Sequence, residues 1–535
     1  MLQRPASQGL SPSKSASHDT RCIPPPLPPA QALPSSPPAS VVVWPAWVLA
    51  ALWGVGLALP AWLSGALVGQ PFTDLYPAVW GMWLAADHWP FGVTHTTQLA
   101  FPNGMGFYYS SPVKGWLAGV LLPWLGTTHT WNLLLVAARV ATVGLSAHAA
   151  RAWGLKGPGV LVVAAGFGCS AVFQGYAVEG IVEGTDGWPL ALWAWSVARD
   201  RRGWSIVALA LCVVSSWYLG AVVCLLAVLA CLRFPHAAWS LAGLVLAGPA
   251  IWAFVGAFSG AEPLDPLVRA AMGAPIQVPR PGVLEGLYPF ALTAYTGVAL
   301  GLTALGARQR WVVLAAVPAV LSLGMGPLYE LPGLSALRFP YRWHLATLAI
   351  LSLAAGRLAD RVRWGWWLGP AIVMETLLLA PVEPVLPGAS ATVPALYAAV
   401  DGPVLDIPGP VALPPGEINA SRPRSRWYLF AQTRHGQPTP WVPDFNSVGT
   451  GRGDPEWEAV AAVLQNFDRV ADGDGEATVP ADLVQRLSRL GVRWIVVHHS
   501  APGLVGAARL KAGFLAQGAV LVEQDQQRWL LKLPS

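Results

Sequence analysis

Charged residues are scarce in this sequence. Asp, Glu, Lys and Arg make up only 11% of its 535 residues, whereas a soluble domain contains about 25%. Hydrophobic residues account for 54%, and the mean hydropathy is +0.48. This composition excludes an ordinary soluble enzyme and predicts a polytopic α-helical membrane protein.

Cysteine is equally rare. The five cysteines are Cys22, Cys169, Cys212, Cys224 and Cys231. Four lie in apolar runs and none forms a CxxC pair, which excludes a disulfide framework and a zinc signature. Ser-His-Asp and P-loop patterns are also absent.

The small excess of basic residues does not indicate a nucleic-acid partner. The net charge is +5, but most Lys and Arg lie in short clusters between apolar runs. This pattern is typical of the cytoplasmic loops of membrane proteins. We therefore expect the lipid bilayer, and no nucleic acid, as a partner.

The sequence divides into three predicted segments. Residues 1–40 are rich in Pro and Ser and cannot bury a core, which predicts a disordered cytoplasmic N-terminus. Residues 41–383 contain about eleven apolar runs that suit transmembrane helices. Residues 384–535 contain the strand-like runs VLDIPG, WYLFAQT, RWIVVHH and RWLLKLP, with helix-like runs between them. They predict a C-terminal extracytoplasmic α/β domain.

Basic clusters set the expected orientation. The clusters RDRR at 199–202 and GRLADRVR at 356–363 follow alternate apolar runs. The positive-inside rule then places the N-terminus in the cytoplasm and the C-terminal domain outside a bacterial-type plasma membrane. The rule holds at Arg151 only if the short run Pro112–Gly126 lies along the membrane surface instead of crossing it.

The first outer loop, residues 64–130, carries the strongest candidate for catalysis. No Asp or Glu occurs between Asp19 and Asp74, and Asp74 follows the first apolar run. A carboxylate at the rim of the bilayer is costly unless it is used or paired, so we expect Asp74 to act as a general base. The alternative is a helix N-cap. A second acid, Asp87, and Lys114, a candidate phosphate ligand or interfacial lysine, lie further along this loop.

Three clusters provide further candidates. Arg139 lies inside an apolar run, where an Arg is by default functional or paired. Arg338, Arg342 and His344 precede another run, and two Arg at a membrane surface suit a lipid-linked phosphate. The other secondary acids lie in the loop QGYAVEGIVEGTDG and are Glu179, Glu183 and Asp186.

The order of these landmarks resembles that of the GT-C superfamily of integral membrane glycosyltransferases, including bacterial relatives of the protein O-mannosyltransferases and aminoarabinose transferases. The resemblance rests on Asp74 after one anchor helix, FPNG at 101–104 and SPVKGWL at 111–117. Further landmarks are Trp131-Asn132, SSWYLG at 215–220, LPGLSALRFPYRW at 331–343, QTRHGQP at 432–438 and GVRWIVVHH at 491–499.

The resemblance implies a polyprenyl-phosphate sugar donor, a glycan, lipid or protein acceptor, and a base in the first outer loop. That role falls on Asp74, and Arg338 or Arg342 become the implied phosphate ligands. Many members carry a second acid beside the first, whereas Leu75 and Tyr76 follow Asp74 here. A divalent cation is therefore allowed but not favoured, and no cofactor is assigned.

Two other functions stay open at this stage. A transporter or flippase for a lipid-linked or small solute would have charged residues facing each other at mid-bilayer; Arg139 and Glu375 lie deep in apolar runs. The second open function is a scaffold that kept the fold and lost the chemistry, because the second acid expected beside Asp74 is missing.

Overall fold

The computed structural model describes most of the chain, and its described residues from 43 onwards lie in one compact unit, residues 40–535. The described ranges are 43–71, 74–89, 94–258, 295–323, 340–409, 421–441, 455–469, 479–500 and 506–534. Arg338 and the first forty residues lie outside them.

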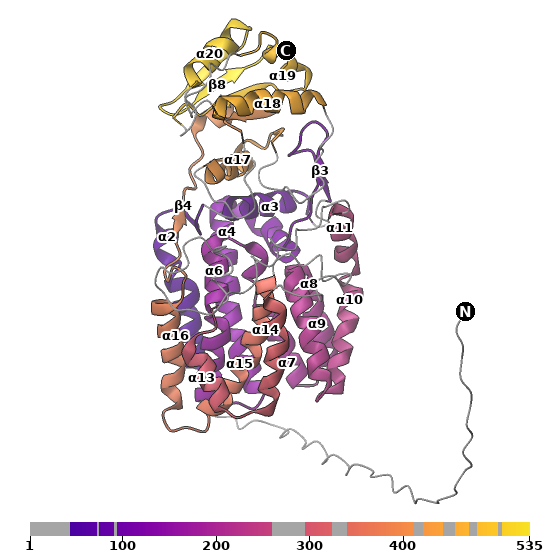
Figure 1. Cartoon of the computed structure of the whole chain (residues 1–535), viewed down its shortest axis with the longest axis vertical. Coiled ribbons are helices and arrows are strands. Elements are labelled where there is room, and N and C mark those ends of the chain that lie inside the picture. Colours follow the sequence, from indigo (N-terminus) through magenta and orange to yellow (C-terminus); the bar gives the residue numbers. More distant parts are fainter. Residues whose placement is uncertain are drawn as a thin grey trace, which may run out of the picture. The chain divides into compact units, whose positions relative to one another are not determined.

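Helices dominate the described chain up to residue 380 (Figure 1). They are α1 (Trp44–Ala51), α2 (Leu59–Leu63), α3 (Leu75–Asp87), α4 (Pro112–Ala152), α5 (Gly157–Val163), α6 (Ala171–Glu179), α7 (Trp188–Ala198), α8 (Arg202–Ser215), α9 (Trp217–Cys231), α10 (Gly243–Leu246), α11 (Gly248–Phe258), α13 (Val298–Gly306), α14 (Ala316–Ser322), α15 (His344–Ala359) and α16 (Leu368–Leu379).

Some of these helices are long and apolar enough to cross a membrane. Within the described residues they are Pro112–Ala152 and Gly157–Glu179, and the pair Pro235–Leu246 and Gly248–Ala257, bent by 54°, adds a third if it is one span. Shorter apolar helices of 10–17 residues lie at Trp44–Gly56, Arg202–Ser215, Trp217–Cys231, Arg310–Ser322 and Gly365–Leu379. The number of eleven spans stays a prediction.

Helix α4 consists of two helical segments. Gly126 has φ 69° and ψ 171°, and Pro123 lies just before it. Positive φ favours glycine, since other residues pay a steric cost there. The break coincides with the expected end of the surface helix Pro112–Gly126; its position relative to the lipid stays a prediction.

Carboxylates inside the helical bundle cap helix N-termini. Glu375 of α16 accepts hydrogen bonds from the Tyr295 hydroxyl at 2.7 Å and from the backbone N–H of Ala299 at 2.8 Å, at the start of α13. Asp360 accepts from the backbone N–H groups of Lys156 and Gly159 at 2.7 and 2.8 Å, at the start of α5. A negative charge stabilises the positive end of a helix dipole, so each of these partly exposed carboxylates has a structural partner.

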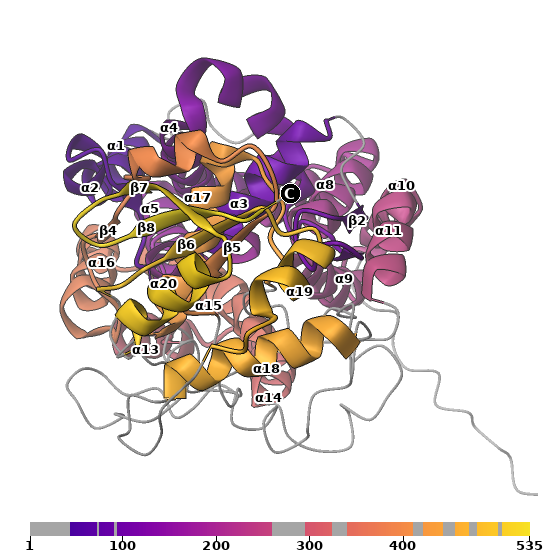
Figure 2. The same ribbon diagram turned by 90° about the horizontal axis from the view of Figure 1, so that it is seen from above.

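A four-stranded mixed sheet forms the C-terminal part, in the order β5 (Val404–Ile407), β6 (Trp494–Val497), β8 (Trp529–Lys532), β7 (Val520–Gln524). Strands β5 and β6 are parallel, and the other pairs are antiparallel. The side chains alternate between two faces. One face packs on α18 (Pro455–Arg469), α19 (Leu483–Arg489) and α20 (Ala507–Ala516), which Figure 2 shows gathered on one side.

The second face of the sheet packs on α17 (Ser421–His435). This helix corrects the prediction that WYLFAQT forms a strand. Residues 428–432 are buried in succession, so the helix shows no apolar period of 3.6 and resembles a buried strand in sequence. The predicted division at residue 384 stays a prediction, because the compact unit runs from 40 to 535.

Two short strand pairs involve the first outer loop. Strand β1 (Leu67–Val68) pairs antiparallel with β4 (Gly388–Ala389), at the beginning of the C-terminal part. Strand β2 (His95–Thr96) pairs with β3 (Met105–Gly106) inside the loop itself. The first pair ties the beginning of the loop to the C-terminal part, and the second pair closes a hairpin within the loop.

The start of α3 is fixed by the end of α6. The backbone N–H of Asp74 donates to the carbonyl oxygen of Glu179 at 3.1 Å. Gly180 ends α6 with φ 70°, and a Cβ there would lie 2.4 Å from the Cα of Leu75. This close approach places Asp74 beside the loop that carries the other candidate acids.

We expect Gly180→Ala to destabilise the protein by roughly 1–3 kcal/mol, because alanine meets both an unfavourable φ and a backbone clash. Thermal unfolding of the solubilised full-length protein measures the change. Gly203→Ala in α8 is the matched control, since a Cβ there meets nothing within 4 Å. Equal melting temperatures for the two variants would contradict this account.

His435, at the end of α17, gives a pH-dependent expectation. Its Nδ1 accepts the backbone N–H of Gln437 at 3.0 Å, and its ring stacks on Tyr397 with centroids 5.4 Å apart. Burial lowers the pKa of His435 from 6.5 to about 4, and the charge of Asp406 opposes this shift. The neutral imidazole therefore belongs to the folded state.

Between pH 6.5 and pH 4 the unfolded chain binds more protons at His435 than the folded one does. The free energy of unfolding should consequently fall as the pH is lowered through this window, by up to about 3 kcal/mol, and level off below it. Comparing wild type with His435→Asn, which removes the titrating group, isolates the effect. Identical pH profiles for the two proteins would show that His435 does not contribute.

Candidate functional site

The first feature of the site is a buried ion pair between α4 and the loop after α6. Lys114 Nζ lies 3.0 Å from Asp186 Oδ1, with side chains 4% and 2% exposed. It also donates to the carbonyl oxygen of Val182 at 3.0 Å and to the hydroxyl of Thr185. An ammonium has three N–H donors, and these contacts occupy them. Lys114 therefore fixes the loop after α6, residues 180–187, which we call the acidic loop. Phosphate binding to Lys114 would require these contacts to break.

A second ion pair lies beside the first one. Arg342 Nη1 donates to Glu183 Oε1 at 2.9 Å, and the guanidinium is buried while Glu183 is 19% exposed. Consecutive serines join the two pairs, because Ser110 donates to Glu183 Oε2 at 3.2 Å and Ser111 donates to Asp186 Oδ2 at 3.1 Å. The start of α4, the acidic loop and the segment before α15 thus meet in one network.

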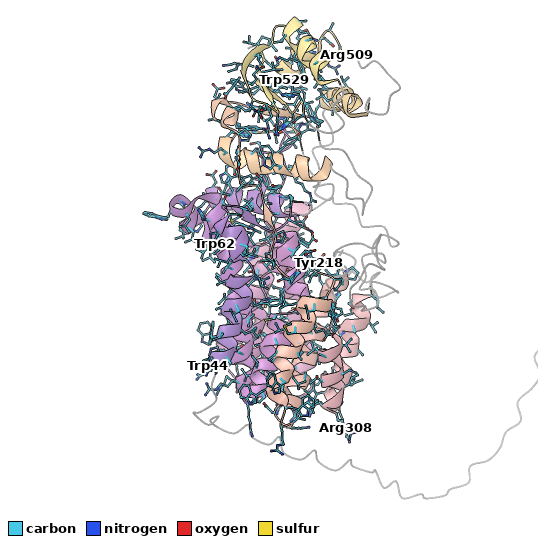
Figure 3. The ribbon with its side chains drawn as sticks, turned by 90° about the vertical axis from the view of Figure 1, so that its left-hand side faces the viewer. Trp44, Trp62, Tyr218, Arg308, Arg509 and Trp529 are labelled. Atoms are coloured by element: carbon cyan, nitrogen blue, oxygen red, sulfur yellow. The ribbon has the colours of Figure 1, made fainter. Side chains whose placement is uncertain are left out.

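Tyrosine rings surround the Arg342 guanidinium. Its Cζ lies 4.1 Å from the ring centre of Tyr218, 5.7 Å from that of Tyr176 and 5.8 Å from that of Tyr341. Cations are attracted to aromatic faces at such distances. Figure 3 places Tyr218 in the part of the helical bundle nearer to the sheet, and Trp44 and Arg308 at the opposite end.

Asp74 does not use its side chain as a helix cap, although it occupies the N-cap position of α3. Its Oδ1 accepts a hydrogen bond from Arg426 Nη1 of α17 at 3.1 Å. The Arg426 side chain is 3% exposed and that of Asp74 is 40% exposed. The carboxylate is therefore anchored by a buried cation from the C-terminal part and still reaches solvent.

The charges of Asp74 and Glu183 both act on Tyr341. Burial raises the pKa of Tyr341; the charge and hydrogen bond of Arg342 lower it, and the carboxylates of Glu183 and Asp74 both raise it further. Burial likewise raises the pKa of Tyr109 well above its usual value, with Asp186 and Glu183 adding to the effect. Both tyrosines consequently stay protonated and can only donate or accept hydrogen bonds.

The remaining candidates lie elsewhere or have local roles. Arg139 Nη2 donates to the carbonyl oxygen of Trp53 at 2.9 Å and to Gln174 Oε1 at 2.8 Å, and its side chain is buried. His344 Nε2 lies 3.0 Å from the hydroxyl of Thr296. Asp87 ends α3 with its side chain 67% exposed. Glu179 is buried at the end of α6.

The Arg139 contact reaches the C-terminal part through Gln174. Gln174 Nε2 donates to the carbonyl oxygens of Glu383 and Pro384 at 2.7 and 2.8 Å. Arg139 is thus paired with a neutral amide, in agreement with the expectation that an Arg in an apolar run is functional or paired. These contacts connect α4 and α6 with the segment that leads into the sheet.

No group of three or more His, Cys, Asp or Glu side chains in the described ranges could hold a metal ion. Asp74, Glu183 and Asp186 are each bound to a cation, as described above. Arg338 lies outside the described residues, so its proposed contact with phosphate rests on sequence alone.

Sequence reasoning missed Arg426, the partner of Asp74. The two residues are 352 positions apart, and no local pattern connects them. It also missed the roles of the hydroxyls of Ser111, which opens the landmark SPVKGWL, and of Ser110 directly before it. A serine pair between an aromatic run and a helix start was the available signal.

The fold is similar to that of known membrane glycosyltransferases. The arabinofuranosyltransferase AftD from Mycobacteria superposes with a TM-score of 0.57 at 16% identity, over 92% of this chain and 40% of that chain. A mutant of AftD gives 0.56 at 16% identity, over 92% and 41%. This chain thus spans about 40% of the length of AftD. The likeness confirms, for the fold, the resemblance to the GT-C superfamily.

A looser similarity links the chain to ArnT from Cupriavidus metallidurans, solved bound to undecaprenyl phosphate. The TM-score is 0.41 at 13% identity, over 92% of this chain and 97% of that chain, which supports no correspondence between residues. No protein-family model matches the sequence, and a search of curated proteins found no match.

We expect Lys114→Met and Asp186→Asn each to destabilise the protein strongly. Removing one partner of a buried ion pair leaves an uncompensated charge or unpaired donors, which costs roughly 3–5 kcal/mol. The double variant should lose much less than the sum of the two single changes. Thermal unfolding of the four proteins in detergent tests this, and additive losses would show that the two side chains do not interact.

Proposed function

We propose that this chain, which has the fold of a GT-C membrane glycosyltransferase, transfers a sugar from a polyprenyl-phosphate donor to an acceptor hydroxyl on the extracytoplasmic face. The observation that carries the proposal is the setting of the Asp74 carboxylate. Its carboxylate is solvent-accessible and is held by the buried Arg426, and its backbone N–H bonds to Glu179, at the start of the loop that carries Glu183. A base needs both access to a proton and a fixed position.

In the proposed reaction the acceptor hydroxyl donates a hydrogen bond to Asp74. Its oxygen attacks the anomeric carbon of the donor while the bond from that carbon to the phosphate oxygen breaks. The hydroxyl proton moves to Asp74, and the electron pair of the broken bond leaves with the polyprenyl phosphate. A single displacement inverts the configuration at the anomeric carbon. Asp74 returns its proton to solvent before the next cycle.

The leaving phosphate requires fixed positive charge. We assign this role to Arg342 and, from sequence, to Arg338. A guanidinium binds two phosphate oxygens side by side, and Arg342 is held by Glu183 and by tyrosine rings, so little reorganisation is needed as charge develops. Lys114 takes part through Asp186, which it fixes. Arg139 and His344 support the surrounding helices.

The proposed setting follows from the same fold. The helical bundle would lie in a bacterial-type plasma membrane, with the site and the C-terminal sheet on the outer side. The polyprenyl chain of the donor would lie in the lipid against the helices. A glycan, lipid or protein hydroxyl would approach from outside, with the partly exposed Glu183 as a secondary acid near its path.

The deep charges favour transfer over transport. A transporter would need charged side chains facing each other across a solute path. Arg139 bonds to Gln174 and to a backbone carbonyl, and Glu375 caps α13. Both therefore have structural partners, which removes the specific support for a transporter or flippase.

Asp74→Asn should abolish sugar transfer, because asparagine keeps the shape of the side chain but cannot accept the proton. Transfer is measured with full-length protein in native-like membranes that supply a labelled polyprenyl-phosphate donor pool. Wild type and Asp74→Asn are each assayed with and without a chelator. We expect wild type to be active and insensitive to the chelator.

Asp87→Asn is the matched control, because Asp87 lies at the exposed far end of the same helix. It should keep wild-type activity. Full activity of Asp74→Asn would refute the assignment of the base. A well-folded wild type without transfer would favour the inactive scaffold, and loss of activity on chelation would require a metal.

A further inference from the structure

We propose that Arg426 is a positioning residue for Asp74, and that the C-terminal part of the chain thereby completes the site in the first outer loop. This inference rests on the proposed function of Asp74 as the base. It adds a residue and a dependence on the C-terminal part that the GT-C resemblance does not supply.

The contact is built as an anchor. Arg426 donates through Nη1 to Oδ1 of Asp74 at 3.1 Å. Its side chain is 3% exposed, so it is enclosed by protein, while the Asp74 side chain is 40% exposed. Holding Oδ1 leaves Oδ2 as the oxygen that meets an approaching hydroxyl. A carboxylate fixed at one oxygen has a defined direction for the other, which a freely rotating side chain lacks.

Arg426 is itself held by α17, and α17 contacts the first outer loop at further points. The Phe430 ring lies 5.7 Å from that of Tyr76, which is two residues after the base on α3. Gln432 Nε2 donates to the carbonyl oxygen of Gln98 at 2.7 Å. These contacts set the spacing between α17 and α3, which Figure 1 shows side by side.

The opposite side of α17 is attached to the sheet. The Tyr428 hydroxyl donates to the carbonyl oxygen of Pro408 at 2.9 Å, directly after β5. The Tyr428 ring lies 4.8 Å from that of His498, whose Nε2 is 2.9 Å from Asp406 Oδ1. All of these side chains are buried. The position of Arg426, two residues before Tyr428 on the same helix, is therefore set by the sheet.

This arrangement differs from a surface ion pair. An exposed pair contributes little and exchanges readily with water. Here a buried guanidinium approaches a partly exposed carboxylate, and breaking a contact to a buried charge costs more than breaking an exposed one. The geometry therefore maintains the ion pair between Arg426 and Asp74 while Oδ2 of Asp74 stays accessible.

The test uses Arg426→Ala and Arg426→Lys in the full-length protein reconstituted in lipid. Arg434→Ala is the control, since Arg434 is exposed on the same helix. One readout needs no enzymatic activity: modification of Asp74 by a carbodiimide with an added amine, measured by mass spectrometry. The other is the sugar-transfer rate from the labelled donor pool. Both are repeated with millimolar guanidinium, which can fill the space left by Arg426→Ala.

We expect Arg426→Ala to increase modification of Asp74 several-fold and to lower the transfer rate by about 100-fold, the effect of misplacing a reacting group by about 1 Å. Guanidinium should reverse both changes. Arg426→Lys should retain an intermediate rate, and Arg434→Ala should match wild type. A purely structural defect in Arg426→Ala would not be reversed by guanidinium.

The inference is overturned if Asp74 modification is the same in wild type and Arg426→Ala, or if the rate of Arg426→Ala equals that of wild type. It is also overturned if guanidinium restores neither readout. If modification changes as expected and wild type transfers no sugar, the contact stands and the proposed function fails, so the two failures are distinguishable.

Discussion

The arrangement of the site depends on the ion pair between Lys114 and Asp186. Both side chains are almost completely buried, and a buried charge is tolerated only when its partner and its hydrogen bonds are in place. The pair fixes the start of α4 against the loop after α6. The same loop carries Glu183, which holds Arg342, and it follows Gly180, which packs directly against the first residue of α3. Asp74 takes its position from that packing.

A second constraint comes from outside the helical bundle. Helix α17 lies between the sheet and the first outer loop, and it delivers Arg426 to the carboxylate of Asp74. The site thus combines residues from the first outer loop, the acidic loop, the segment before α15 and the C-terminal part. Segments so distant in sequence come together because each of them contributes or receives a buried charge.

Much of the site could be predicted from the sequence. Asp74 stands out as the first acid after a long apolar run, and Lys114, Glu183, Asp186 and Arg342 were all identified as candidates. Their pairing could not be predicted, because Lys114 and Asp186 meet only through tertiary packing. The strands β5, β6 and β8 appear as short apolar runs. Helix α17 was mistaken for a strand, since a helix buried on several sides loses its period, and Arg426 was missed with it.

The central claim is a single displacement assisted by Asp74, and the anomeric configuration of the product tests it most directly. Reconstituted full-length protein would be given a polyprenyl-phosphate sugar of one defined anomeric form, and the product would be examined by NMR before it can equilibrate. The account predicts a product of inverted configuration. A product with retained configuration, or no glycosidic product from a well-folded protein, would contradict it.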